Sequence, residues 1–288
     1  MAKRGLRILV RTDVDWGSMD VERFAAQDDP TRPLLFIRHA LERDLIPMFR
    51  RIYGMDYFEF RGAIQRLAAS RLAAVAGARV SVGFADFETW FHDPSDELVC
   101  PVDDDDIFHP GLVARLHALA PETELVIWKH AAVGYAPTQT RAGVHRWNEH
   151  VLFSNNWGID KAYLRRLLPP DEARLFLSCH RTAQSRMAGV YGIPERLDQG
   201  GFGHFVELEH ERLRFLDEFL SLQLFHVGSL SGLWARSLQG ADENALRELE
   251  LVSPVELPEE LDWAAGFVLD HAELMARVAA LSVGQRAP

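Results

Sequence analysis

The sequence predicts an α/β protein with a mostly parallel sheet flanked by helices and a helical C-terminal half. Strand-like and helix-like segments alternate through the first half, which is typical of parallel sheets. The second half has two long stretches of helical periodicity, residues 207–225 and 258–281.

The first expected strand, residues 6–10, is apolar and runs into the polar residues Arg11, Thr12 and Asp13. Ligands of α/β proteins bind at the carboxyl ends of strands, so we expect these three residues to line a nucleotide site. Further strands are expected at 80–84, 97–102, 124–128 and 151–153, and helices at 34–52, 60–76, 111–119 and 160–167. Asp160 is expected to cap the last of these helices.

The 288 residues fit one domain that divides into residues 1–120, residues 121–240 and C-terminal helices at 241–288. The net charge of −11 argues against broad binding to a nucleic-acid backbone. No apolar run approaches the roughly 20 residues of a transmembrane helix, and no signal-peptide pattern is present. We therefore expect a cytoplasmic protein without nucleic-acid partners.

The strongest local signal is a run of four carboxylates, Asp103 to Asp106, between an apolar strand and an expected helix. Four adjacent like charges repel one another, and a bound Mg²⁺ or Mn²⁺ is one way to neutralise them. In an extended segment alternate residues face the same side, so Asp103 and Asp105 are expected to converge on one ion, with Asp104 facing away. The alternative is a solvated acidic turn in which Asp106 caps the following helix.

The strand, acidic run and helix resemble the DxD region of GT-A-fold glycosyltransferases. The sequence around Asp103–Asp106 is similar to that of bacterial proteins described as rhamnosyltransferases, which are related to family 2 glycosyltransferases. The resemblance implies a GT-A-like, Rossmann-type fold, a nucleotide-sugar donor and a glycan or small-molecule hydroxyl acceptor. It also implies that residues 1–120 form the nucleotide-sugar-binding half and residues 121–240 the acceptor-side half. It also implies that Asp103 and Asp104 contact the nucleotide, that Asp103 and Asp105 bind the metal, and that Asp106 lies close to the sugar as a catalytic residue. One departure is that Arg11, Thr12 and Asp13 replace the Pro-x-Tyr-Asn-type start of family 2 enzymes.

Two other polar segments are candidate ligand contacts. His226 is a candidate third metal ligand, and Ser229 lies beside it among small residues whose amides can approach a phosphate. Asn155, Asn156 and Trp157 combine amides with an indole, which suits a sugar ring. The alternatives are a helix-ending loop with a packed His226, and an ordinary turn before the Asp160 cap.

An inverting transferase needs a general base for the acceptor hydroxyl, and His180 and Asp198 are the candidates. The P-loop, GxGxxG, GxSxG and HExxH patterns do not occur. The sequence therefore favours a metal-dependent glycosyltransferase. A metal-dependent nucleotidyltransferase or phosphohydrolase, and a non-catalytic nucleotide- or glycan-binding domain, stay open.

Overall fold

The structure is a computed structural model of the whole chain. It describes residues 4–11, 56–72, 77–134, 142–147, 151–152, 155–178, 204–205, 212–225, 250–252 and 256–284, with the single positions 47, 50 and 75. The expected helix at 34–52 lies almost entirely outside the described residues.

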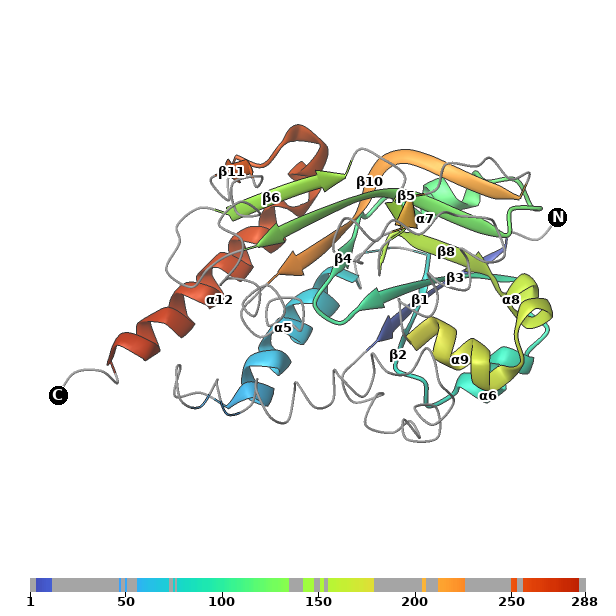
Figure 1. Cartoon of the computed structure of the whole chain (residues 1–288), viewed down its shortest axis with the longest axis horizontal. Helices are drawn as coiled ribbons and strands as arrows, with labels where there is room; N and C mark the ends of the chain where they lie inside the picture. Colours follow the sequence, from blue (N-terminus) through green and yellow to red (C-terminus); the bar gives the residue numbers. More distant parts are fainter. Residues whose placement is uncertain are drawn as a thin grey trace.

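Strands and helices alternate through the first half of the chain and are joined into a mixed α/β fold (Figure 1). In chain order the elements are β1 (Gly5–Arg11), α5 (Tyr57–Leu72), β2 (Arg79–Val82), α6 (Phe87–His92), β3 (Glu97–Asp103), β4 (Ile107–Phe108), α7 (Leu112–His117), β5 (Leu125–Gly134), β6 (Ala142–Trp147), β7 (Val151–Leu152), β8 (Trp157–Asp160), α8 (Lys161–Leu167), α9 (Pro170–Ser178), β9 (His204–Phe205), β10 (Leu213–Phe225), β11 (Glu250–Val252), η3 (Glu259–Ala264) and α12 (Ala265–Gly284). The α/β class is confirmed, as are the first-half strands and the helices within 60–76, 111–119 and 160–167.

Within the described ranges, the main sheet has nine strands and is mixed. Strands β2, β1 and β3 are parallel neighbours, and β10 runs parallel to β5. Strand β8 lies antiparallel between β3 and β5. The expectation of a mostly parallel sheet therefore holds for the blocks on either side of β8 and fails at β8, β6, β4 and β11.

Strand β5 organises the second half of the sheet. β10 pairs along its whole length, whereas β8 pairs with its first residues and β6 with its last. Because one edge of β5 is fully used by β10, β8 and β6 must share the other edge. The sheet consequently branches at β5.

The expected helix at 207–225 is wrong, because β10 occupies residues 213–225 of it. Four leucines lie three or four residues apart along this strand: Leu213, Leu216, Leu220 and Leu224. The pairing with β5 is irregular on both sides of Phe219, which shifts the phase of the side-chain alternation. A strand with such a break can have leucines at helix-like spacing, and for this reason the sequence pattern indicates a helix where the structure has a strand.

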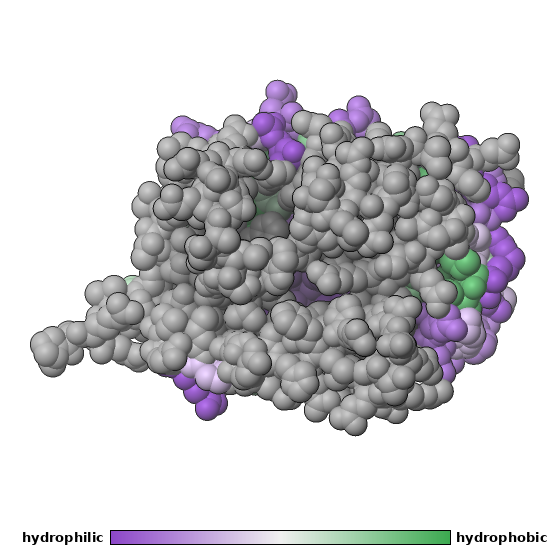
Figure 2. All heavy atoms as spheres, in the orientation of Figure 1, coloured by the Kyte–Doolittle hydropathy of each residue, from purple (hydrophilic) through white to green (hydrophobic). Residues whose placement is uncertain are grey.

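Alternate residues of β1 face opposite sides of the sheet, and each side has its own apolar cluster. Leu9 belongs to a cluster with residues of α6, α8 and α9. Ile8 and Val10 belong to a second cluster with residues of α5 and α7. Helices therefore cover both faces, as expected for an α/β fold. Most of the coloured surface in Figure 2 is hydrophilic, apart from a small hydrophobic patch near one edge.

The expected helical segment at 258–281 is confirmed as η3 followed by α12. Helix α12 lies beside α5 (Figure 1), and Arg71 of α5 pairs with Asp270 of α12 at 2.6 Å. Buried residues of both helices pack against the ends of β5 and β10 in a third apolar cluster. The N-terminal end of α5 is thereby fixed next to β4 and the acidic run.

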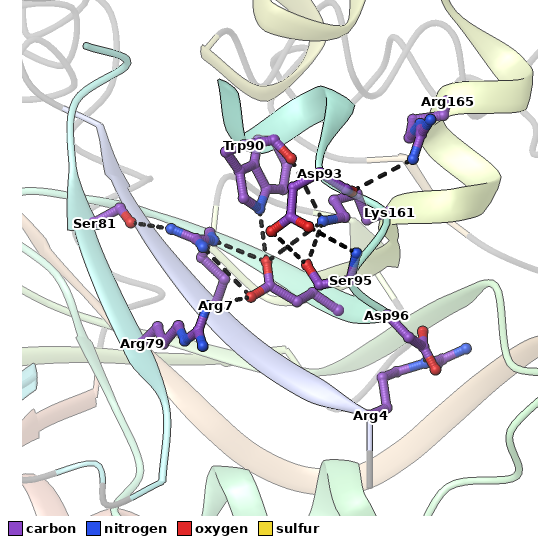
Figure 3. Close-up of polar contacts among 11 residues, drawn as sticks. Arg4, Arg7, Arg79, Ser81, Trp90, Asp93, Ser95, Asp96, Lys161 and Arg165 are labelled. Atoms are coloured by element: carbon purple, nitrogen blue, oxygen red, sulfur yellow. Dashed lines mark hydrogen bonds and ion pairs between the residues drawn. The ribbon is translucent and has the colours of Figure 1, made fainter. Parts of the chain in front are cut away.

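The amino end of β3 is held by its first residue, the buried carboxylate Glu97. Its partners Arg7, Trp90 and Lys161 are labelled in Figure 3. Arg7 donates to Glu97 Oε2 at 3.0 Å and the Trp90 indole donates to the same oxygen at 2.6 Å. The Lys161 ammonium lies 3.9 Å away. Burial alone raises the pKa of Glu97, but the Arg7 and Trp90 hydrogen bonds and the Arg7 and Lys161 charges outweigh it and hold the pKa below its usual range.

We expect Glu97→Gln to lower the free energy of unfolding by about 1.5–3 kcal/mol near neutral pH, the usual range for hydrogen bonds to a charged group. Because the folded-state pKa is lowered, the wild-type advantage is complete above the unfolded pKa of about 4.3 and is lost as the pH falls through the folded value. Urea unfolding at several pH values measures it. Asp96→Asn is the matched control, since the Asp96 side chain is 67% exposed. Equal effects of the two substitutions at pH 7 would contradict the prediction.

Candidate functional site

The acidic run forms a turn at the carboxyl end of β3. Strand β3 ends at Asp103. The next two residues, Asp104 and Asp105, form the turn, and the Asp106 amide donates to the Asp103 carbonyl at 3.1 Å. The expected extended geometry is therefore wrong from Asp104 onwards. The expectation that Asp104 faces away from the other carboxylates fails with it, because a turn does not alternate its side chains as a strand does.

Asp103 pairs with Arg11, the last residue of β1. The two residues are register partners on adjacent parallel strands, and Arg11 Nη2 lies 2.8 Å from Asp103 Oδ1. The Arg11 side chain is 2% exposed and that of Asp103 is 30% exposed. Asp103 is consequently the most accessible carboxylate of the run.

Asp104 and Asp105 share one guanidinium group, that of Arg61 on α5. Arg61 Nη1 donates to Asp105 Oδ2 at 2.8 Å, and Nη2 donates to Asp104 Oδ1. Gln65, one turn further along α5, donates to the other Asp104 oxygen. Asp104, Asp105 and Arg61 are all buried, so helix α5 closes one side of the turn.

Neither Arg61 nor Gln65 was among the residues selected from the sequence. The signal for Arg61 was present, since Arg61 lies on the same helical stripe as the buried residues Ile64, Ala68 and Leu72. A cation on a buried helical face requires a buried anion as a partner. The acidic run was the evident source of that anion.

Asp106 lies behind the turn and is fully buried. Its Oδ2 accepts from Asn155 Nδ2 at 2.9 Å, and its Oδ1 accepts from the Leu224 amide of β10 at 2.8 Å. Burial, together with the charges of Asp105 and Asp103, raises the pKa of Asp106 well above its usual range. Contact between Asp106 and a sugar stays a prediction, whereas its contacts in the structure join the acidic turn to β10.

Asn155 and Asn156 are both buried and hydrogen-bonded within the protein. The Ser221 hydroxyl is 3.5 Å from Asn155 Oδ1 and accepts from the Trp128 indole at 2.9 Å. Asn156 donates to the Trp128 carbonyl at 2.7 Å. Asn155 thus joins the acidic site through Asp106, whereas Asn156 supports β5.

Trp157 is a core residue in this structure. It is the first residue of the inner strand β8, has no exposed surface, and packs edge-on against Phe176 with ring centroids 5.7 Å apart. Because β8 lies between β3 and β5, both of its edges are paired, and all four of its residues are buried. The expected sugar platform therefore has no exposed indole face.

The carboxylates of the turn have cationic partners from the protein itself. Among the described residues, the three carboxylates of Asp103, Asp104 and Asp105 pair with the two guanidinium groups of Arg11 and Arg61, and these five side chains carry a net charge of about −1. Arg11 and Arg61 thus supply part of the neutralising charge, and metal binding by this run stays a prediction. A residual negative charge beside the accessible Asp103 still favours a cation at this place.

Several expected site residues lie outside the described residues: Thr12, Asp13, His180, Asp198, His226 and Ser229. Their roles stay predictions. Within the described ranges, no group of three or more His, Cys, Asp or Glu side chains is arranged to hold a metal ion. No helix in the described part of the chain has the length and apolar character needed to cross a membrane.

Comparison of the sequence with protein-family models finds no match, and comparison with curated proteins also finds none. The functional argument for this chain therefore depends on the geometry of its own residues.

Proposed function

We propose that this chain is a glycosyltransferase that moves a sugar from a nucleotide-sugar donor to a hydroxyl group of a glycan or small molecule. The observation that supports this most is the position of Arg11 and Asp103. Strand β1 is followed in the chain by β2 on one side of it, whereas β3 lies on its other side. The Arg11–Asp103 pair stands at the carboxyl ends of β1 and β3, at this switch in strand order, where open α/β sheets bind nucleotides.

The donor set suits an open Mg²⁺ or Mn²⁺ site rather than an all-protein cage. Such ions are commonly held by one or two carboxylates and by the phosphates of the ligand. Asp103 and Asp105 would hold the ion, because a carboxylate has about four acceptor positions and can pair with an arginine and bind an ion at the same time. When bound, such an ion would neutralise the charge of the leaving diphosphate. Arg11 orients Asp103, and Arg61 keeps Asp105 from moving out of the turn.

The structure bears on the competing functions through Arg61. Two-metal nucleotidyltransferases and phosphohydrolases bridge a pair of ions with shared carboxylates. Here Asp104 and Asp105 are bridged by a guanidinium group, which disfavours that class. A non-catalytic nucleotide-binding domain is distinguished by the absence of sugar transfer. His180 and Asp198 stay the candidate general bases, and the cytoplasm stays the expected compartment.

We expect binding of a nucleoside diphosphate to require a divalent cation, because a diphosphate is repelled by the residual negative charge of the turn. With UDP, GDP or dTDP at about 100-fold above its Kd, the melting temperature should rise by roughly 5 °C in Mn²⁺. In excess chelator the shift should disappear. An undiminished shift in chelator would contradict the metal assignment, and no shift with any nucleotide in Mn²⁺ would contradict the proposed function.

A further inference from the structure

We propose that strand β2 is the pairing site for a second copy of this chain, in an antiparallel arrangement that joins the two main sheets. Among the described strands, β2 stands last on the β1 side of the main sheet. Its inner edge pairs with β1 in continuous parallel register. The inference concerns assembly rather than the reaction, so it does not depend on the proposed function.

The backbone of β2 directs hydrogen-bonding groups away from β1. The amide of Gly83, just after the strand, donates to the Val10 carbonyl at 2.9 Å, so Gly83 faces β1. Successive residues of a strand direct their amide and carbonyl groups to opposite edges. Ser81 therefore also faces β1, whereas the backbone groups of Val80 and Val82 face outwards. These two residues can exchange hydrogen bonds with another strand.

The same two residues expose apolar side chains. Val80 is 43% exposed and Val82 is 67% exposed. Their register partners on β1 are Ile8 and Val10, which are buried in the cluster with residues of α5 and α7. Register partners on adjacent strands lie on the same face of a sheet. The valines thus continue an apolar face of the sheet to its edge, where a further strand would cover them.

The outer strand β10 differs from β2 in how its edge is protected. Its pairing with β5 is irregular around two acidic residues, Asp217 and Glu218. Charged residues and bulges are the usual features that prevent sheet edges from pairing with other chains. Strand β2 combines a regular register with exposed valines, so its edge is the one suited to pairing.

A twofold axis at Ser81 gives the register that uses the whole strand. Val80 of each copy then lies opposite Val82 of the other, and these are hydrogen-bonded pairs because their backbone groups face outwards. Pairs of β-branched residues directly opposite one another stabilise a sheet. The two Ser81 residues form the central, non-hydrogen-bonded pair on the other face, where each hydroxyl accepts from Arg7 of its own chain at 2.5 Å.

The charges around β2 favour an antiparallel second copy. The strand begins at Arg79, whose side chain is 71% exposed, and the chain after it leads to the exposed residues Asp86 and Glu88. Antiparallel pairing brings the basic start of each strand towards the acidic segment after the other, so complementary charges meet twice. Arg79 itself lies opposite Gly83, which avoids a clash of like charges.

The test is the oligomeric state of the whole chain, measured by sedimentation velocity at increasing protein concentration. Two four-residue strands bury much less than the roughly 800 Å² per partner of a standard interface, so we expect a weak and reversible dimer. The double variant Val80→Lys/Val82→Lys should stay monomeric, because lysines then lie directly opposite one another. Lysines reduce the net charge of −11, so general repulsion between chains does not explain such a loss.

The matched control is Phe58→Lys, which makes the same change at another exposed apolar residue, 59% exposed on α5. It should dimerise as the wild-type protein does. Melting temperatures of the same samples establish which variants are folded. If the double variant does not fold, Val82→Lys replaces it and should weaken dimerisation roughly 10-fold, since it disturbs both valine pairs.

Cysteine cross-linking tests the register. With copper–phenanthroline as oxidant, Ser81→Cys should form a disulfide between two chains, because opposite residues of a non-hydrogen-bonded pair have Cα atoms about 4.5 Å apart. Val80→Cys should cross-link at least about 10-fold more slowly, since its two copies lie diagonally at roughly 8 Å. Both variants carry Cys179→Ser, and the remaining native cysteine, Cys100, is buried.

A wild-type chain that stays monomeric at every concentration would overturn this inference, and an extended segment of another protein would then be the alternative occupant of the edge. A dimer that persists in the folded lysine variants would also overturn it, because another surface would then form the contact. Equal cross-linking rates at positions 80 and 81 would exclude the proposed register. None of these results bears on nucleotide binding or sugar transfer.

Discussion

Asp105→Asn is expected to reduce sugar transfer by at least about 100-fold and to abolish the effect of Mn²⁺ on nucleotide binding. The substitution keeps the shape of the side chain and deletes the charge that a divalent cation requires. Loss of a residue that only orients a metal ligand already costs about 10- to 100-fold, so the loss of a ligand should cost more. Isothermal titration with UDP, GDP and dTDP in Mn²⁺ and in chelator measures the binding effect.

Asp104→Asn is the matched comparison for Asp105→Asn and should be milder in transfer. The reason is that both Asp104 oxygens accept from α5, through Arg61 and Gln65, whereas the proposed function assigns metal binding to Asp105. Asp104→Asn should lower the melting temperature more than Asp105→Asn does, since it disturbs two contacts. If the two variants lose sugar-transfer activity equally, Asp105 does not act as a metal ligand while Asp104 only supports the turn, and the prediction is wrong.

Asp106→Ala is expected to lower the free energy of unfolding by roughly 3–5 kcal/mol. The substitution leaves the Leu224 amide and the Asn155 side-chain amide without their acceptor in a fully buried place, and each unsatisfied group costs about 1–3 kcal/mol. The space left by the carboxylate adds a cavity term. Urea unfolding of the purified protein measures the change.

Asp270→Ala is the control for Asp106→Ala, because Asp270 pairs with Arg71 at the surface and such pairs contribute about 0–1 kcal/mol. A loss below about 1 kcal/mol in Asp106→Ala would show that β10 and the acidic turn are not coupled through this carboxylate. Asn155→Ala should show part of the same loss, since it removes one of the two donors and keeps the Leu224 contact.

The sequence by itself determined the elements whose side-chain pattern is local. The strand at β3, the acidic run after it and the Asp160 cap of α8 all follow from neighbouring residues, and the cap bond from Tyr163 to Asp160 measures 2.6 Å. Helix α12 could also be predicted from the sequence, because its apolar residues keep helical spacing throughout. These features depend on backbone geometry and nearest neighbours, which a single chain segment already contains.

Only the tertiary structure decided the partners of the acidic run and the identity of β10. The pairing irregularity in β10 exists only in register with β5, so no local pattern distinguishes it from a helix. Arg61 reaches Asp104 and Asp105 across more than 40 positions, and Leu224 reaches Asp106 across 118. Four adjacent carboxylates only indicate that positive charge is needed. Whether it comes from a metal or from Arg11 and Arg61 depends on which strand and helix ends the fold brings to the carboxyl end of β3.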